Sequence, residues 1–345
     1  MSEKQRITIY DISKKLNISA ATVSRALNDD PKISKKTQDL VRETAVKMNY
    51  KRNRLAQALK SGRTNNIAVI VPYIDRNFFS SIIRGIEEEL TPHGYHVIIC
   101  QSHEKVQNEV EQIATLLNTQ VDVILMSISK TARNFDHIRS ILKDKTPLVF
   151  FDRTIKSPQV SSVLIDDFKA GYIATEHLIN QGCKKIAHLC GDRNVNIYKN
   201  RHDGYRAALK KFGIQYSPDY VIEVSSKVKS GMAAVRSLWH LEVTPDAIFA
   251  AGDYAALGAI QELKNKNVEI PEEVCIVGSS NEPFTKYMEM PITSISQTPR
   301  LMGKIAAQVI LEQIKESYFI EKKITLPPEL FIRDSSARSI VDLSV

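Results

Sequence analysis

The sequence predicts an α/β protein in which a small all-α headpiece precedes two doubly wound parallel-sheet subdomains. From residue 66 onward, short apolar runs rich in Val and Ile alternate with amphipathic helical stretches. Such alternation indicates βαβ units, and continuous apolar runs are typical of parallel strands covered on both faces. The first 63 residues differ, because they contain three helix-like pieces and no strand-like run. A chain of 345 residues exceeds one hydrophobic core, so we expect at least two domains.

The headpiece elements are bounded by capping and turn residues. Three helices are expected over Ile9–Leu16, Ala20–Asn28 and Lys35–Asn49, followed by a short fourth helix over Asn53–Lys60. The hydroxyls of Ser19 and Ser34 can accept a free N–H group in the first turn of the second and third helices. Asp29-Asp30-Pro31 breaks the chain between those two helices.

Nine apolar runs of the body are expected as strands. They cover residues 66–72, 95–100, 121–127, 147–151, 161–166, 184–190, 219–224, 246–252 and 273–279. The stretches between them are amphipathic, as where Ile82, Ile83, Ile86 and Leu90 form one apolar stripe. Nine or ten strands favour two sheets rather than one.

The positive charge is confined to one end of the chain. Residues 1–63 hold 15 of the 47 Lys and Arg residues but only 6 of the 39 Asp and Glu residues. The remaining residues carry 32 basic and 33 acidic side chains, so they are close to neutral. A small basic module on a neutral body indicates contact with a polyanion at one end.

Several classes of protein are excluded by what the sequence lacks. It has no apolar run long enough for a membrane span and no secretory leader, so we expect a cytoplasmic protein. The four cysteines lack CxxC spacing and are expected to be reduced packing residues. His93, His96 and His103 lack helical i, i+4 spacing, and no GxGxxG, GxxxxGK[ST], GxSxG or HExxH motif occurs. We therefore expect no metal, no cofactor and no enzymatic activity.

The first two helices form a helix-turn-helix, whose second helix fits the DNA major groove. Val23 and Leu27 are expected to pack inward. Arg25 can donate two hydrogen bonds to guanine, and Ala20 and Ala21 are small enough for close approach to thymine methyl groups. The outward polar residues suit base-edge or phosphate bonds, and they are Thr8, Ser24, Asn28, Ser34 and Thr37.

Two long stretches near the N-terminus read ITIYDISKKLNISAATVSRALND and ISKKTQDLVRETAVKMNYKRNRLAQALKSG. They resemble the N-terminus of the lac/gal repressor family (LacI/GalR) of bacterial transcription regulators. FDR (151–153), GYRAAL (204–209), GDYAALGAI (252–260), PEEVCIVG (271–278), QTPRLMGKIAAQVI (297–310) and LPPELFIRDSS (326–336) resemble its later landmarks. The resemblance implies a dimeric regulator whose affinity for operator DNA is set by a small-molecule effector.

The resemblance also implies a domain plan. Residues 1–50 are the DNA-binding headpiece, 51–63 a hinge helix or linker, and 64–340 an effector-binding and dimerisation core of the periplasmic-binding-protein type I fold, with Rossmann-like subdomains. The first subdomain is expected over about 64–162 and 292–323, and the second over about 163–291 and 324–340. Helices within 80–90 and 108–118, together with their counterparts in the second subdomain, are expected at the dimer interface. No leucine heptads follow Arg338, so no coiled-coil tetramer is expected.

The implied DNA contacts extend beyond the recognition helix. In the family the segment matching Asn53–Lys60 orders on DNA, and the residue matching Leu59 enters the minor groove as an apolar wedge. Arg52 stands where the family often has Pro, which loosens the hinge. A flexible linker whose Leu59 packs on the body is the alternative. The remaining expected contacts are Ser19, Thr22, Tyr50, Asn53, Arg54, Ala56 and Gln57.

The implied effector site lies at the carboxyl ends of the strands. Arg201 matches the family arginine that contacts the effector. The other expected residues are Tyr73, Phe78, Phe79, Gln101, Ser127, Asp152, Arg153, Ser226, Asp253, Ser280 and Asn281. Ser280 replaces a frequent Asp and Ser226 a frequent aromatic, so the usual acidic clamp and stacking ring are missing. Lys199, Arg201 and Lys227 suggest that the pocket tolerates an acidic or phosphorylated sugar derivative.

Several of the expected roles have structural alternatives. Asp152 can instead pair with Arg153, and Asp253 can instead cap the helix that follows it. Arg201 can instead be a surface arginine at a helix start, and one of Phe78 and Phe79 can instead pack in the core. At the level of the whole chain, the alternatives are a sugar-binding transport protein or an enzyme on the same fold. The basic headpiece argues against both, so a nucleoid-associated regulator, most simply a repressor, is the prediction.

Overall fold

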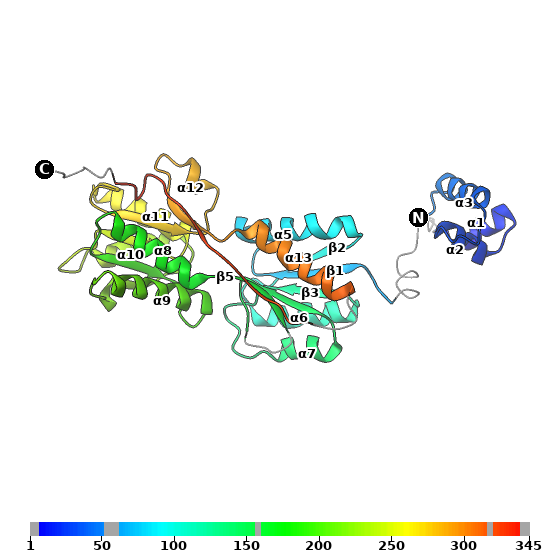
Figure 1. Cartoon of the computed structure of the whole chain (residues 1–345), viewed down its shortest axis with the longest axis horizontal. Coiled ribbons are helices and arrows are strands. Elements are labelled where there is room, and N and C mark those ends of the chain that lie inside the picture. Colours follow the sequence, from blue (N-terminus) through cyan, green and yellow to red (C-terminus); the bar gives the residue numbers. More distant parts are fainter. Residues whose placement is uncertain (1–6, 52–61, 156–159, 316–319, 339–345) are drawn as a thin grey trace, which may run out of the picture. The chain divides into compact units, whose positions relative to one another are not determined.

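The computed structural model describes residues 7–51, 62–155, 160–315 and 320–338 (Figure 1). The chain divides into two compact units, Met1–Thr64 and Asn65–Val345. In the described residues, the first unit contains helices and no strand, and the second contains two largely parallel sheets with helices on both faces of each. The predicted fold class is therefore confirmed. Within the described residues, no helix is long and apolar enough to cross a membrane.

Three helices form the headpiece, namely α1 (Ile9–Leu16), α2 (Ala20–Leu27) and α3 (Lys35–Lys47). Their core includes Ile12, Val23, Leu27 and Val41. Helices α2 and α3 end slightly before the expected positions. The backbone of Asn28 has left the helical region, and Asn49 has a φ of 52°, in the left-handed region that stops a helix.

The first sheet has the strand order β11-β5-β4-β3-β1-β2, with every neighbouring pair parallel. Helices α5 and α13 cover one face, and α6 and α7 cover the other (Figure 1). The strands are β1 (Asn66–Val71), β2 (His96–Gln101), β3 (Val123–Met126), β4 (Leu148–Phe151), β5 (Ser161–Ile165) and β11 (Lys323–Leu326). The helices are α5 (Asn77–Leu90), η1 (Thr91–His93), α6 (Val106–Asn118), α7 (Asp136–Asp144) and α13 (Pro299–Lys315).

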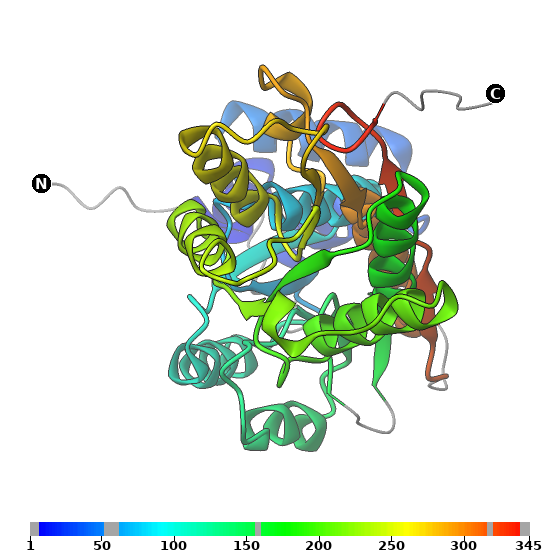
Figure 2. The ribbon, with the colours of Figure 1, turned by 90° about the vertical axis from the view of Figure 1, so that its left-hand side faces the viewer.

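The second sheet has the order β12-β10-β9-β8-β6-β7, in which only β12 is antiparallel to its neighbour. Helices α8 and α9 cover one face, and α10 and α11 the other (Figure 2). The strands are β6 (Ile186–Cys190), β7 (Val221–Glu223), β8 (Ala247–Ala250), β9 (Cys275–Ser279), β10 (Thr293–Ser296) and β12 (Glu329–Phe331). The helices are α8 (Asp167–Asn180), α9 (Asn196–Lys211), η2 (Pro218–Tyr220), α10 (Val228–Leu238), α11 (Asp253–Asn265) and α12 (Phe284–Tyr287).

The chain passes between the two sheets three times, after β5, after β10 and after β11. These crossings differ from the expected limits of the subdomains. All of β5 and β11 pair in the first sheet, although residues 163–165 and 324–326 were expected in the second subdomain. Strand β10 pairs with β9 and β12 in the second sheet, although it was expected in the first. Hydrogen bonding between strands, which a single sequence does not display, decides these limits.

Three helix pairs pack with their backbones in close contact, because each helix contributes a glycine. The pairs are α5 with α13, α8 with α9 and α10 with α11. In the second pair, a Cβ on Gly171 would lie 2.0 Å from the Arg201 carbonyl oxygen, and one on Gly204 would lie 2.0 Å from that of Phe168. Only glycine permits this approach, which fixes the position of α9 against α8.

Candidate DNA-binding headpiece and effector pocket

The recognition helix α2 begins at a capped turn. The Ser19 hydroxyl accepts the Thr22 N–H at 3.0 Å and lies 2.8 Å from the Thr22 hydroxyl. Ala26 is buried with Val23 and Leu27, which leaves the opposite face of the helix toward solvent.

The outward face of α2 carries the residues expected to contact DNA. Ala21, Arg25 and Asn28 are exposed, and Ala20 and Ser24 are partly exposed. The Asn28 side-chain nitrogen donates to the Ser24 carbonyl at 2.8 Å. Its side-chain oxygen can therefore still accept a hydrogen bond. The face thus presents a guanidinium between small and polar side chains.

The starts of α1 and α3 hold the other predicted contacts. The Ser34 hydroxyl accepts the Thr37 N–H at 3.3 Å and so caps α3. At α1, the Asp11 carboxylate accepts from both the N–H and the hydroxyl of Thr8, at 2.7 and 2.8 Å. These bonds lower the pKa of Asp11, which keeps a negative charge at the N-terminal end of the helix, where it complements the helix dipole.

The remaining headpiece predictions have mixed placements. Tyr50 is partly buried against the headpiece core, and its N–H donates to the Ala45 carbonyl at 2.8 Å. The predicted hinge contacts lie outside the described residues, and these are Asn53, Arg54, Ala56, Gln57 and Leu59. The residues expected to contact DNA did not include Tyr10, a large exposed aromatic side chain on α1. The inward spacing of Ile9, Ile12 and Leu16 would have placed Tyr10 outside.

The second unit contains a cavity of about 200 Å³ at the carboxyl ends of strands from both sheets. Of the residues predicted for an effector, those that line it are Tyr73, Phe78, Phe79, Asp152, Arg153, Arg201, Ser226, Asp253 and Ser280. Lys227, one of the expected cations, lines it as well, whereas Lys199 does not. Further lining residues that were not predicted individually are Arg76, Glu104, Lys130, Ile197, Tyr198, Ser225, Ala251, Gly252, Tyr254, Glu282 and Gln297. Both subdomains thus contribute to one pocket.

Three predicted residues do not line this cavity, because their side chains bond within the protein. The Gln101 side-chain oxygen accepts the Ile74 N–H at 3.0 Å. The buried Ser127 hydroxyl donates to Asp152 at 2.9 Å, and the Asn281 side-chain oxygen accepts from Arg333 at 2.6 Å. Each of them positions a loop or a pocket residue instead.

Arg153 anchors the wall formed by the first subdomain. Its Nη1 donates to both carboxylate oxygens of Glu104, at 2.9 and 3.0 Å, and its Nε lies 3.6 Å from Asp152. Burial raises the pKa of Asp152, while Arg153 and Ser127 oppose that rise. The Asp152–Arg153 pairing therefore exists within the site, and it neutralises this part of the wall.

Arg201 projects from α9 and is held from behind. Its Nε donates to Asp167 at 2.8 Å, and its Nη1 donates to the Ala251 carbonyl at 3.3 Å. Its buried Nη2 has no hydrogen-bond partner within the part of the chain that the structure describes. Burial raises the pKa of Asp167 to about 6, against the influence of Arg201. One face of the guanidinium is thus fixed, and Nη2 keeps donors for a ligand.

Asp253 organises the loop after β9. Its carboxylate accepts the Glu282 N–H at 2.8 Å and the Ser294 hydroxyl at 2.6 Å. It is the first residue of α11, whose N-cap is Gly252, so it does not cap that helix as the sequence allowed. Burial raises its pKa to about 6. These contacts make Asp253 a positioning residue for Glu282 and Ser294.

Glu282 places a carboxyl in the pocket two residues beyond the position of the missing acidic clamp. Burial and the neighbouring Asp253 raise its pKa to about 7, while Arg76 opposes the rise. The Arg76 guanidinium lies 4.8 Å from the centroid of the Tyr254 ring, which joins the two subdomains across the cavity. The sequence offered no spacing signal for this group, because it depends on the conformation of the loop.

Comparison with known proteins agrees with this architecture. Residues 8–53 match the model of the bacterial regulatory proteins of the lacI family, and residues 64–333 match that of the periplasmic binding proteins and sugar binding domain of the LacI family. The HTH-type transcriptional repressor PurR of Haemophilus influenzae (strain PittEE) is 31% identical over 337 residues, covering 95% of this chain and 98% of PurR.

Solved structures extend the comparison. The transcriptional regulator CelR–cellobiose complex is 26% identical, with a TM-score of 0.74, and the match covers 96% of this chain and 100% of that one. The lac repressor dimer bound to operator and the anti-inducer ONPF has the same fold, with a TM-score of 0.86 at 22% identity, over 97% of this chain and 100% of that one. The chain therefore belongs to the LacI family of bacterial regulatory proteins, with a helix-turn-helix DNA-binding headpiece and a periplasmic-binding-protein-like domain.

Proposed function

We propose that the protein is a homodimeric transcriptional repressor that binds a pseudo-palindromic operator and changes its DNA affinity when a small molecule occupies the pocket. The outward face of α2, with Arg25 exposed at its centre, is the observation that carries this proposal. The repressor title of PurR and the operator-bound lac repressor dimer support it by similarity. The protein would act in the cytoplasm, on the nucleoid, without catalysis.

Arg25 supplies the test of DNA recognition. We expect Arg25→Ala to weaken binding to an operator, selected from a random duplex pool, by about 10- to 100-fold, because a bidentate guanine contact contributes about 1–3 kcal/mol. Arg25→Lys keeps the charge but loses the planar fork, so it should lose operator preference and keep most non-specific binding. Fluorescence anisotropy across a salt series separates sequence-specific binding from salt-dependent non-specific binding.

The same measurement applied to Leu59→Ala tests the hinge, whose residues lie outside the described ranges. An apolar wedge would make this variant weaken operator binding without changing the affinity for random duplex. Operator affinity at fixed salt that is unchanged in both Arg25→Ala and Leu59→Ala would contradict the DNA-binding assignment of these residues.

The effector we propose is a sugar or sugar derivative carrying an anionic group. The matched family domain is described as sugar-binding, and CelR was solved with cellobiose. Around the cavity, Arg153 is paired with Glu104 and Asp152, whereas Nη2 of Arg201 has no partner among the described residues. Three further cations line the cavity, namely Arg76, Lys130 and Lys227. The two further carboxyls are Asp253 and Glu282, and burial raises their pKa values to about 6 and about 7. Lys199 lines a separate pocket and is not part of this charge balance.

Calorimetry with matched neutral, acidic and phosphorylated sugars tests the charge preference. We expect the anionic members to bind more tightly, and Lys227→Met to reduce that advantage by several-fold. Lys199→Met is the matched control, because it removes the same charge outside the cavity and should leave affinity unchanged. Tight binding of a neutral sugar, with no binding of its acidic or phosphorylated forms, would remove the anionic proposal and leave the regulator proposal intact.

A further inference from the structure

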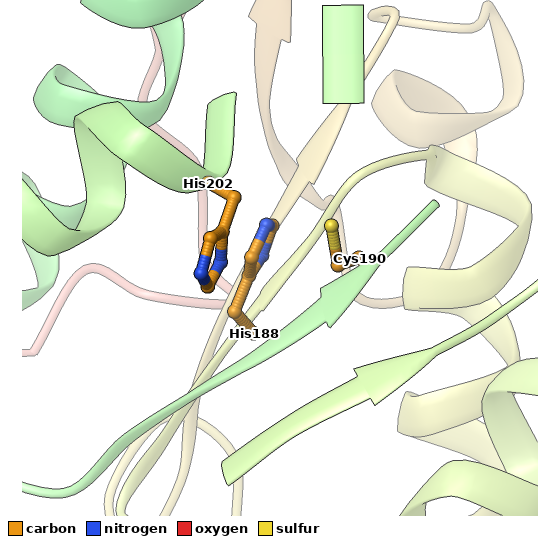
Figure 3. Close-up of side chains that lie close together, drawn as sticks. All are labelled: His188, Cys190 and His202. Atoms are coloured by element: carbon orange, nitrogen blue, oxygen red, sulfur yellow. The ribbon is translucent and has the colours of Figure 1, made fainter. Parts of the chain in front are cut away.

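Three side chains with metal-ligating atoms lie together inside the second subdomain, outside the effector pocket. His188 and Cys190 come from β6, and His202 comes from α9 (Figure 3). They are 0%, 1% and 4% exposed, and one ligand atom from each lies within 4.8 Å of the other two. The sequence led us to expect no metal site, because the cysteines lack CxxC spacing and His93, His96 and His103 lack helical i, i+4 spacing. The three residues found here were not considered together, since only the packing of α9 on the sheet brings them close.

The tautomer of His188 follows from its hydrogen bond. Its Nδ1 lies 3.0 Å from the Phe249 carbonyl oxygen, and since a carbonyl oxygen only accepts, Nδ1 must carry the proton. The ring also stacks on Phe249, with centroids 4.6 Å apart. Nε2 is therefore an unprotonated acceptor, buried without a partner among the described residues. This arrangement, one nitrogen donating to a carbonyl and the other free, is that of metal-binding histidines.

His202 and Cys190 also have ligating atoms with weak hydrogen bonds or none. His202 Nδ1 is buried without a partner in the described part of the chain, while its Nε2 lies 3.5 Å from the Tyr216 hydroxyl. The Cys190 sulfur has only a weak contact, 3.8 Å from the Tyr198 carbonyl oxygen. Leaving buried polar atoms unpaired is costly, so two unpaired imidazole nitrogens beside a weakly bonded thiol call for a bound group.

We propose that His188, Cys190 and His202 form a binding site for one Zn²⁺ ion. Two imidazoles and a thiolate are ligands that zinc prefers, at about 2.0–2.1 Å for nitrogen and about 2.3 Å for sulfur. On binding, the Cys190 thiol releases its proton and its sulfur bonds to the metal, with no change in oxidation state. The fourth position is left for water, which is the coordination of an open zinc site.

Binding requires one side-chain adjustment. The rings of His188 and His202 are stacked, with centroids 5.7 Å apart and planes 12° apart, whereas both nitrogens must direct their lone pairs at one ion. His188 is held by Phe249, so His202 is the ring that turns. His202 also lines a surface pocket of about 410 Å³, which provides an entry path. Three acidic and three basic side chains line that pocket, and their charges balance.

The test uses full-length protein without a histidine tag, stripped with a chelator and titrated with Co²⁺ and then Zn²⁺. We expect one ion per chain, a thiolate-to-cobalt charge-transfer band, and displacement of cobalt by zinc. Cys190→Ser should abolish the band, and His188→Phe, which keeps the stacking on Phe249, should weaken binding at least 100-fold. Cys100→Ser is the control, because Cys100 lies in the other subdomain and should leave both readouts unchanged.

The wild-type protein alone can overturn the proposal. Absence of stoichiometric Co²⁺ and Zn²⁺ binding would mean that a buried water, rather than a metal, satisfies the three atoms. A charge-transfer band that persists in Cys190→Ser would place the metal at another cysteine. Circular dichroism of each variant shows that lost binding does not reflect lost folding, and neither result depends on the DNA or the sugar.

Discussion

Single side chains show what the sequence could and could not predict about the site. The pattern around Arg201 predicted its place at the cavity, but its partner Asp167 lies 34 residues earlier and was not proposed. Ser127 and Asn281 follow strands as pocket residues do, yet their side chains bond within the protein. A short polar side chain at a strand end can face the ligand or a loop, and only the packed loop decides which. Glu282 lines the pocket because the conformation of its loop, rather than its place in the sequence, sets the direction of its side chain.

Glu282 leads to a prediction about pH at this scale. Its pKa is raised to about 7, so the carboxyl is mostly neutral at pH 6 and mostly charged at pH 8. An anionic effector should therefore bind more weakly as the pH rises, by up to about tenfold, since one charge pair across a partly solvated pocket contributes about 1–2 kcal/mol. Calorimetry at pH 6 and pH 8 measures this with a ligand whose own charge is constant in that range. Glu282→Gln should reduce the difference to the part left by Asp167 and Asp253, whose pKa values are about 6. An undiminished pH effect in the variant would assign it to those groups.

At the scale of elements, the strands that were predictable are those made of apolar runs. All nine expected strands occur, whereas β10, β11 and β12 were missed. Strand β10 reads Thr-Ser-Ile-Ser yet is fully buried, because Ser294 bonds Asp253 and Thr293 bonds Ser335 and Arg333. Its polar groups are satisfied by partners distant in sequence, so no apolar pattern marks it. Strands β11 and β12 are short and lie at sheet edges.

The helix pair α8 and α9 carries the second prediction. Gly171→Ala places a methyl group 2.0 Å from the Arg201 carbonyl oxygen, so we expect a loss of about 1–3 kcal/mol in the free energy of unfolding. The shift of α9 should also weaken effector binding, because it moves Arg201. Gly252→Ala is the control for stability, since a Cβ there meets nothing within 4 Å. Urea unfolding compares the two, and equal stabilities would refute the close packing of the pair.

At the scale of the whole molecule, the exposed apolar side chains point to the dimer. Strand β2 is an edge strand of the first sheet, and Ile98 and Ile99 on it are exposed. Val110 on α6, a helix predicted at the interface, is exposed as well. A bare apolar edge is an aggregation hazard that proteins normally cover. A second copy of the chain, packed about a two-fold axis, would cover it.

A charge placed on the exposed edge of β2 tests whether this edge forms the dimer interface. Ile99→Asp should convert the dimer to a monomer and weaken binding to a palindromic operator, because the two headpieces are no longer linked. Val243→Asp is the matched control, since Val243 is 46% exposed, against 44% for Ile99, and lies in the other subdomain. Light scattering coupled to size-exclusion chromatography gives the mass. A dimeric Ile99→Asp protein would locate the interface elsewhere.

The late position of β11 and β12 in the chain has a consequence for biosynthesis. Strand β11 completes the edge of the first sheet beside β5, and β12 completes the edge of the second beside β10. Both are made after residue 320, so a nascent chain that already holds eleven-twelfths of the sequence still exposes an unpaired edge in each sheet. Neither subdomain can finish folding while its C-terminal strand is inside the ribosome, and chains cut short near residue 320 would be prone to edge-to-edge aggregation.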